Sequence, residues 1–365
     1  MQKQTLGFLV INKKHENTYI TEIAKRSEYF NIECVRFEPM SIDPASLLIN
    51  GEKFDPPSQQ WISSSFPIPS FIYDRCFYNS HQASKKGKPI VEWLKKNPTT
   101  TFLGFGLPDK WQVYTSLRGQ QIIDSYLPQT ELLNDPIQVI KHLKVAGPCI
   151  LKPINGSRGV GIIAIKQTSE NITITYHKGH DKKMKNFSTL KDLSKWCEKL
   201  ISQQAYLLQP LLPLTDANNY PFDIRLFLQK NQTGEWNLIE KGIRKGYHGS
   251  FLSNLNSGGD PLSFADWSQS LTYKQKYLLE DELATIIDYL PLLLEKQFKQ
   301  LFEIGVDIGY AQDGSIWILD INSKPGRKTF TKTNPKLKEK LYNAPLKYCQ
   351  FLSNDPTAKG VEIND

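Results

Sequence analysis

One stretch, residues 302–326 (FEIGVDIGYAQDGSIWILDINSKPG), constrains the fold more than any other part of the chain. Two apolar runs flank the dipeptide Asp313-Gly314. Asp-Gly favours two-residue hairpin turns in which φ is positive, so the stretch predicts a β-hairpin centred on this pair. Counting outward from the turn places Asp307 on the first strand directly opposite Asp320 on the second.

Two opposed carboxylates in a mostly apolar hairpin repel each other, and a folded protein rarely keeps such a pair without compensation. Asn322 lies on the same face as Asp320, because strand side chains repeat every two residues. Three oxygen ligands without a neighbouring Cys or His set suit Mg²⁺. The alternative is an ordinary surface hairpin whose acids are solvated.

The composition is that of a globular protein long enough for two or three domains. Of 365 residues, 39% are hydrophobic, 11% aromatic and 22% charged, which excludes a disordered chain. No apolar stretch approaches the roughly 18 residues that span a bilayer, and no signal peptide is recognisable, so we expect a cytoplasmic protein without a membrane partner. The five cysteines are scattered and never form CxxC, so neither a disulfide framework nor a zinc site is indicated.

The formal net charge is +8, with short basic runs at Lys85-Lys86-Gly87-Lys88 and Lys182-Lys183-Met184-Lys185. Runs this short are usually solvated faces, so no specific nucleic-acid partner is expected. The same charge suits an enzyme whose ligands are polyphosphates and carboxylates. Composition leaves open whether the chain forms a homo-oligomer.

The N-terminal part predicts an α/β unit with a parallel sheet. Residues 6–11 and 32–37 read as strands, and residues 19–30 between them have helical apolar spacing. The proline-rich segment 49–69 is expected to be loop or meander. A further strand ends in Asp74-Arg75, at the edge where α/β sheets place ligand contacts, although a structural ion pair is the favoured interpretation.

Residues 97–109 are typical of a domain boundary, and Asp109 is expected to cap a helix that begins at Lys110. Residues 149–166 then predict strand, glycine-rich loop and strand, with Lys152 near the end of the first strand. Glycine loops let backbone N–H groups approach phosphates. The spacing is neither a Walker A nor a Rossmann motif, and a plain hairpin with a flexible tip is the alternative.

The remaining segments follow in a definite order. Residues 206–212 (YLLQPLL) form an apolar strand ending in a proline-containing hinge, and Asp223-Ile224-Arg225 begins another strand. Residues 242–259 are expected to be a polar loop dense in donors. Residues 273–302 have long helical periodicity that Pro291 should kink or restart, and residues 336–352 read as a closing helix.

This ordered set resembles the ATP-grasp carboxylate-amine ligases, including ribosomal-protein glutamate ligases and glutathione synthetases. The motifs YDR, KPINGSRGVGI, GIRKG followed by FLSNLNSGG, and LDINSKPG are more narrowly similar to spore-coat-associated ATP-grasp proteins of the YheC/YheD type. The resemblance implies an α/β (α+β) ATP-grasp fold. It comprises an N-terminal parallel-sheet pre-ATP-grasp domain (1–105), two α+β subdomains that clasp ATP (106–205 and 206–355) and a tail (356–365).

The resemblance also implies roles for particular side chains, transferred onto matching positions. Nucleotide binding falls to Lys110, Lys152, Gly156, Ser157, Gly159, Gly161, Gln209, Leu211, Leu212 and Asp223. The catalytic residues are Arg225 and Arg244, which would neutralise phosphate charge, and Asn254, which resembles a phosphate- and metal-side asparagine. Metal binding falls to Asp307, Asp320 and Asn322. The expected cofactors are ATP and Mg²⁺, as two ions, with Mn²⁺ as the alternative metal.

Three positions depart from the family pattern. Asp320 stands where relatives usually carry Glu, and Leu252 stands where the glutamate ligases have Arg. Gln209-Pro210 replaces a frequent Glu in the hinge and removes one backbone donor. The glutamate ligases' amino-acid substrate is therefore not carried over.

The implied reaction joins a small-molecule or peptide carboxylate to an amine through an acyl phosphate, with release of ADP and phosphate. Arg75 and Lys324 are the residues we expect to hold the carboxylate of the acid substrate. Two alternatives use the same nucleotide machinery. One is an ATP-binding or degenerate ATP-grasp protein with a structural role in a spore coat, and the other is a phosphotransferase. Spore association follows from the resemblance only.

Overall fold

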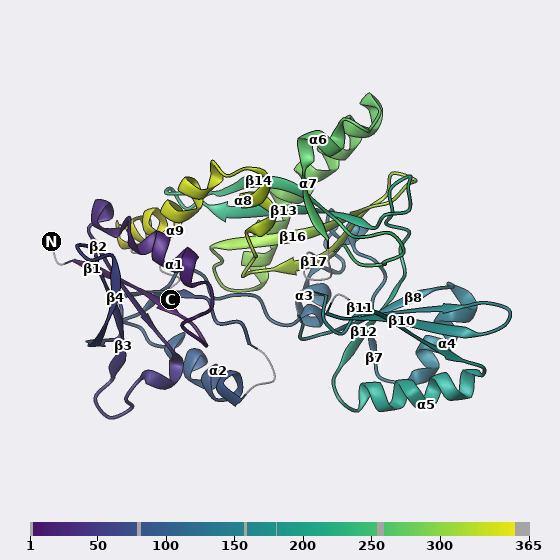
Figure 1. Ribbon diagram of the computed structural model, residues 1–365, viewed down its shortest axis with the longest axis horizontal. Coiled ribbons are helices and arrows are strands. Elements are labelled where there is room, and N and C mark those ends of the chain that lie inside the picture. Colours follow the sequence, from purple (N-terminus) through teal and green to yellow (C-terminus); the bar gives the residue numbers. More distant parts are fainter. Residues whose placement is uncertain (1–2, 79–81, 157–158, 180, 254–258, 355–365) are drawn as a thin grey trace.

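The computed structural model describes residues 3–78, 82–156, 159–179, 181–253 and 259–354. Three β-sheets follow one another along the long axis of the molecule (Figure 1). The N-terminal sheet lies at one end, the C-terminal sheet in the middle and the sheet that carries the glycine loop at the other end. This arrangement, together with the mixed helices and strands, is the expected α/β (α+β) architecture.

The N-terminal sheet has six strands, of which four run parallel as the sequence predicts. Helices cover both of its faces, which is why its central strands are buried on both sides. The segment expected to be loop or meander is an antiparallel hairpin, β3–β4. In spatial order the strands are β4 (Gln60–Pro67), β3 (Leu48–Asp55), β2 (Ile32–Phe37), β1 (Gln4–Leu9), β5 (Phe71–Asp74) and β6 (Thr101–Phe102).

Three helices complete this part of the molecule. Helix α2 (Gln82–Leu94) packs on one face, through Val91 and Leu94. Helices α1 (Asn17–Ala24) and α9 (Leu337–Asn354) pack on the other face, so the C-terminal helix returns to the N-terminal core (Figure 1). Short 3₁₀ turns occupy η1 (Ser27–Phe30) and η2 (Pro39–Ser41).

The sheet that carries the glycine loop has one helical layer. Its core alternates along the strands, as in Ile163 and Ile165 of β9, which face α4 and α5. Asp135 and Gln138 form a capping box that starts α4, with Pro136 in its first turn. The elements are β7 (Glu131–Leu133), α4 (Pro136–Val145), β8 (Cys149–Pro153), β9 (Ile163–Gln167), β10 (Ile172–Lys178), β11 (Asp181–Phe187), α5 (Leu190–Ile201) and β12 (Tyr206–Pro210), in the sheet order β11-β10-β9-β8-β12-β7.

The C-terminal sheet is antiparallel, in the order β15-β14-β13-β16-β17. Its largest core lies against α3, α6 and α7, while Phe227, Phe330 and Leu341 form a small cluster on the opposite face with α8 and α9. The elements are α3 (Lys110–Leu117), η3 (Asp124–Tyr126), β13 (Phe222–Lys230), β14 (Trp236–Lys245), β15 (Asp260–Ser263), α6 (Phe264–Ser268), α7 (Tyr273–Gln297), β16 (Glu303–Tyr310), β17 (Ile316–Asn322) and α8 (Lys328–Thr333).

Two local expectations change. Helix α7 continues through Pro291, which is buried, so the expectation that the proline restarts the helix is wrong. The polar segment expected from residue 242 onward starts later, since β14 extends to Lys245 and pairs with both neighbours. In the described part of the chain, no helix is both long enough and apolar enough to cross a membrane.

Candidate nucleotide and metal site

The hairpin β16–β17 brings two carboxylates face to face, because Asp307 pairs with Asp320 as predicted. The turn is one residue longer than predicted: Ala311 and Ser315 close a three-residue loop in which Gly314 has a φ of 88°. A type I turn followed by a left-handed glycine is a common three-residue hairpin loop. Such a loop alone would shift the register by one residue.

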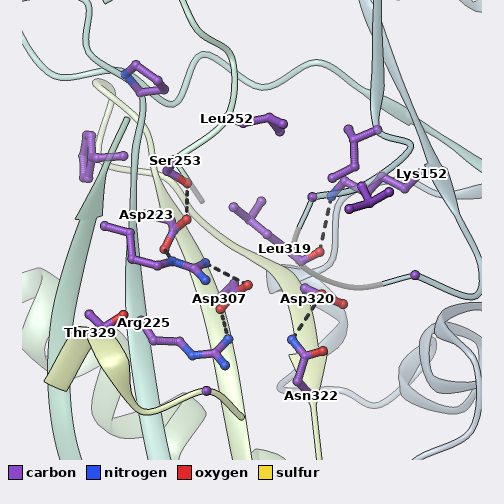
Figure 2. Close-up of a pocket in the computed structure, with 18 of the residues that line it drawn as sticks. Lys152, Asp223, Arg225, Leu252, Ser253, Asp307, Leu319, Asp320, Asn322 and Thr329 are labelled. Carbon is purple, nitrogen blue, oxygen red and sulfur yellow. Dashed lines mark hydrogen bonds and ion pairs between the residues drawn. The ribbon is translucent and has the colours of Figure 1, made fainter. Parts of the chain in front are cut away.

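A β-bulge in β17 restores the register. Ile318 pairs with Ile308, and the next pair joins Asp320 to Asp307, so Leu319 is the additional residue. The Leu319 carbonyl accepts a hydrogen bond from Lys152 Nζ at 3.3 Å (Figure 2). Because Lys152 belongs to β8, this bond joins the metal hairpin to the sheet that carries the glycine loop.

Two arginines neutralise Asp307. Arg225 Nη1 pairs with Asp307 Oδ1, and Arg244 Nη2 lies 2.8 Å from Asp307 Oδ2 (Figure 2). Arg225 reaches this carboxylate by crossing Gly305, where an added Cβ would lie 2.5 Å from Arg225 Nη2. A glycine at this strand position therefore lets the guanidinium lie against the backbone.

Asp320 is neutralised from a different element. Lys110, the first residue of α3, forms an ion pair with Asp320 Oδ1. Asp109 caps this helix as predicted, and its side chain accepts from the backbone N–H of Gln112. Asn322 Nδ2 donates to Asp320 Oδ2 at 3.2 Å, which places the amide on the same face as the carboxylate (Figure 2).

A third carboxylate, Asp223, stands behind Arg244. Its Oδ1 lies 2.7 Å from Arg244 Nε, and its Oδ2 accepts from the Ser253 hydroxyl (Figure 2). Burial raises the pKa of Asp223 despite the arginine. Burial alone would also raise the pKa of Asp307, but Arg225 and Arg244 outweigh it and lower that pKa.

Lys152 lies in an electrostatically unfavourable position. Burial, together with the charge of Lys110, lowers the pKa of Lys152 to about 8, although Asp320 and Asp307 act in the opposite direction. A bound anion would stabilise the charged form of this lysine and raise its pKa again.

The glycine loop joins two antiparallel strands, β8 and β9, as predicted. Gly159 and Gly161 have φ values of 75° and 78°, in the region that favours glycine. At Gly161 an added Cβ would lie 2.9 Å from Pro153 Cγ, so the turn also needs the absence of a side chain. Ser157 lies outside the described residues.

The hinge after β12 offers backbone groups. The Leu211 N–H donates to the Pro148 carbonyl at 2.9 Å, which ties the hinge to the start of β8. Gln209 is buried, and its Nε2 donates to the Thr130 hydroxyl at 2.7 Å. Gln209 thus uses its amide to hold the hinge against the segment before β7.

A single cavity of about 1010 Å³ collects most of the predicted site. The strands of two sheets and the start of α3 supply the part of its wall that carries the predicted residues. The predicted residues that line it are Lys110, Lys152, Gly156, Gly159, Gln209, Leu211, Leu212, Asp223, Arg225, Arg244, Asp307, Asp320, Asn322 and Lys324. Gly161 adjoins this wall without lining it, and Asn254 lies outside the described residues.

The two residues expected to bind the acid substrate have different environments. Lys324 lines the cavity, where it lies 2.7 Å from Asp74 and donates to the Cys76 carbonyl. Arg75 is 0% exposed and does not reach the cavity wall. Its guanidinium contacts Glu16 at 2.6 Å and Glu303 at 2.5 Å, so Arg75 joins the N-terminal sheet to the C-terminal one.

The motif analysis did not identify the cavity residues near the N-terminal sheet. Glu16, Tyr19 and Arg327 line this end, and Arg327 lies 3.7 Å above the Tyr19 ring. Glu16 follows β1 at the carboxyl end of a parallel strand. Ligand contacts in α/β sheets lie at the carboxyl ends of the strands, which is why Asp74-Arg75 was singled out. The same rule could have identified Glu16.

The opposed hairpin offers a donor set that fits Mg²⁺. Among the described residues, no three His, Cys, Asp or Glu side chains gather as a metal-binding group. The available ligands are instead two carboxylates, Asp307 and Asp320, and the amide of Asn322, all of them hard oxygen donors. Lys110 and the two arginines already balance these carboxylates.

Comparisons with known proteins agree on the fold. Residues 99–352 match the YheC/D like ATP-grasp family. The chain is 45% identical over 357 residues to the endospore coat-associated protein YheC of Bacillus subtilis (strain 168), covering 98% of each. D-alanyl-alanine synthetase A from Vibrio cholerae O1 biovar eltor has a TM-score of 0.55 at 15% identity, covering 97% of this chain and 98% of that one. A Chryseobacterium gregarium RiPP-associated ATP-grasp ligase, in complex with ADP and a leader and core peptide, has a TM-score of 0.53 at 11% identity, covering 98% of each. This protein has the ATP-grasp fold and belongs to the YheC/D like ATP-grasp family.

Proposed function

We propose that the protein is an ATP-dependent carboxylate-amine ligase that forms an amide through an acyl phosphate. One observation carries the proposal: four cations and two opposed carboxylates converge in a cavity that also contains a glycine loop and an apolar hinge. The cations are Lys110, Lys152, Arg225 and Arg244. This constellation matches a metal-bound triphosphate in charge and in donor type.

The phosphates would be held from two sides. Lys152 approaches from β8, where it bonds the Leu319 carbonyl, and Lys110 approaches from α3, where it pairs with Asp320. The backbone at Gly156 and Gly159 lines the same cavity and would cover the phosphates. The adenine would lie against the hinge at Leu211 and Leu212, where apolar side chains and backbone groups are available.

The two arginines would act in the transfer step. The substrate carboxylate oxygen attacks the γ-phosphorus, the bond to the β,γ-bridging oxygen breaks, and ADP leaves. Arg225 and Arg244 would exchange part of their contact with Asp307 for the charge that develops on the transferring group. Mg²⁺ bound by Asp307, Asp320 and Asn322 would supply further charge neutralisation.

Amide formation completes the reaction. The amine nitrogen attacks the acyl carbon, phosphate leaves, and the nitrogen's proton passes to solvent or to the departing phosphate. No nucleophilic serine or cysteine is required. Because the RiPP-associated relative is described in complex with peptides, a peptide is a reasonable source of either the acid or the amine.

A structural role is the second candidate, because the Bacillus subtilis relative is called endospore coat-associated. Such a protein would bind ATP without turning it over, and it would be found with spores. A phosphotransferase, the third candidate, would release ADP with an acid alone and accumulate a phosphorylated product.

One assay separates the three. The protein is incubated with ATP, Mg²⁺ and a panel of acids and amines, and ADP release is measured together with product mass. We expect ADP release that depends on both an acid and an amine. Release without an amine supports the phosphotransferase, and ATP binding without release supports the structural role.

Two variants and a control test the site itself. Lys152→Met should abolish ATP binding, and Asp320→Asn should leave ATP binding measurable but make it insensitive to Mg²⁺. Lys332→Met changes an exposed lysine outside the cavity and should bind as the parent does. Unchanged turnover in both site variants would refute the assignment of the cavity.

A further inference from the structure

The cavity continues past the metal hairpin toward the N-terminal sheet. This extension is lined by the segment before α1, by the start of α8 and by part of α9. Its polar side chains include Lys14, Glu16, Arg327 and Lys328, and its apolar wall includes Tyr19, Leu341 and Tyr342. None of these residues has a role in the ATP site described above.

Two lysines in this extension have no acidic partner. Lys14 and Lys328 both line the cavity, and neither forms an ion pair with any residue in the described ranges. Lysine side chains can be solvated singly at a surface without consequence. Lys14 and Lys328 lie more than three hundred positions apart in the chain but line the same cavity. Together they produce an excess of positive charge there.

The acid at this end does not balance them. Glu16 lies 2.6 Å from Arg75 Nε and 3.7 Å from Arg327 Nη1, so two arginines already share its charge. Its backbone has a φ of 53°, a left-handed conformation that a glutamate rarely adopts. Backbone strain of this kind is usually kept where the surrounding contacts determine the position.

The extension is distinct from the phosphate site. Arg327 Nη2 lies 2.8 Å from Glu303 Oε2, and Glu303 precedes Asp307 by four residues on β16. At about 3.3 Å per residue, these two strand positions are about 13 Å apart, on the same face. The end of the cavity at Arg327 and the adjoining Lys328 is therefore separated along β16 from the metal hairpin.

We propose that the carboxylate substrate is itself acidic and carries at least one further negative charge, which Lys14 and Lys328 hold. This inference rests on the proposed ligase function. The reacting carboxylate lies at the metal hairpin, and the second anionic group extends toward α8. The rings of Tyr19 and Tyr342, with centroids 5.9 Å apart, provide an apolar wall for the intervening part of the substrate.

The test uses hydroxylamine as a generic amine, because it traps an acyl phosphate as a hydroxamate. The protein receives ATP, Mg²⁺, hydroxylamine and matched acids: glutamate against glutamine, aspartate against asparagine, and Glu-Glu against Gln-Gln. Each neutral partner keeps its shape and its α-carboxylate, so the comparison is made for hydroxamate formed at that shared carboxylate. We expect hydroxamate formation at least about tenfold faster with the acidic member, as for a charge-assisted hydrogen bond. Equal rates would overturn the inference and leave the ligase proposal intact.

Binding provides a readout that does not need turnover. In the presence of a non-hydrolysable ATP analogue and Mg²⁺, calorimetry should show tighter binding of the acidic member of each pair. If neither member of any pair gives hydroxamate, the difference in affinity between the acidic and neutral members alone tests the proposed substrate class. Acidic members that bind no better than the neutral ones would refute the proposed substrate class.

Variants assign the preference to the two lysines. Lys328→Met and Lys14→Met should each reduce the acidic preference about tenfold while leaving the Kd for the ATP analogue unchanged. Lys332→Met, on the same helix as Lys328 but outside the cavity, should keep the full preference. A preference that survives both Lys328→Met and Lys14→Met would place the recognition elsewhere and contradict the inference.

Discussion

Replacement of Glu303 by glutamine should strongly destabilise the protein. Glu303 is 2% exposed and accepts hydrogen bonds from Tyr73 at 2.8 Å, Arg75 at 2.5 Å and Arg327 at 2.8 Å. The two arginines are 0% and 7% exposed. Glu303→Gln keeps the shape but leaves two buried guanidinium groups with Glu16 as the remaining carboxylate in contact with them.

The expected cost is about 3–5 kcal/mol, the range for a buried ion pair that loses one partner. In thermal unfolding this corresponds to a decrease in Tm on the order of 10 °C. Glu92→Gln is the matched control. Its pair with Lys95, at 3.0 Å, is exposed, so its removal should change stability by no more than about 1 kcal/mol.

A double variant tests the physical reason. If the cost comes from unpaired positive charge, Glu303→Gln combined with Arg75→Met should be less destabilised than the sum of the two single variants. Urea unfolding of the four proteins measures this coupling. A loss below about 1 kcal/mol in Glu303→Gln, or strict additivity in the double variant, would refute the reasoning.

Three further predictions concern the nucleotide site. The pKa of Lys152 is lowered to about 8, so this side chain loses its positive charge above that pH, and affinity for an ATP analogue should fall by up to about tenfold per pH unit. Lys152→Arg keeps the charge and should remove this pH dependence. Calorimetric titrations measure both. The pKa of Lys152 is lowered from 10.5 to about 8 in the folded protein, so between these values the unfolded chain binds more protons than the folded one. The contribution of Lys152 to the free energy of unfolding should therefore rise between about pH 8 and pH 10.5, as measured by urea unfolding. In the glycine loop, Gly161→Ala places a Cβ 2.9 Å from Pro153 at a φ of 78°, so it should lower the free energy of unfolding by roughly 1–2 kcal/mol and weaken ATP binding. Gly156→Ala, where the nearest atom to the added Cβ lies at 3.5 Å, should keep the stability within about 0.5 kcal/mol of the parent. Equal behaviour of the two alanine variants would contradict this account.

Local chemistry made much of the fold predictable. The Asp109 cap depends on residues three positions apart, and the strand-loop-strand around Lys152 depends on a short apolar pattern interrupted by glycines. The facing of Asp307 and Asp320 was also predicted, although for an incomplete reason. The loop is longer than a two-residue turn, and the bulge at Leu319 offsets the difference.

The remaining features depend on contacts that no local pattern specifies. Periodicity shows that a residue is buried, but it does not identify the element that covers it. Arg75 is an example: its position after a strand allowed either ligand contact or a structural ion pair, and no local pattern identifies its partner Glu303, 228 positions away. The ligand roles of the cavity residues stay predictions that the experiments above address.

The position of α9 has a consequence for how the chain acquires its structure during synthesis. Leu346, Tyr348, Cys349 and Leu352 of this last helix are buried in the same core as β1 and α1. A ribosome that has completed only the first hundred residues has therefore made a sheet with one face partly uncovered. This face of the N-terminal sheet stays exposed to chaperones or to neighbouring chains until α9 has been synthesised. Docking of α9 onto β1 and α1 should accordingly be a late step in folding.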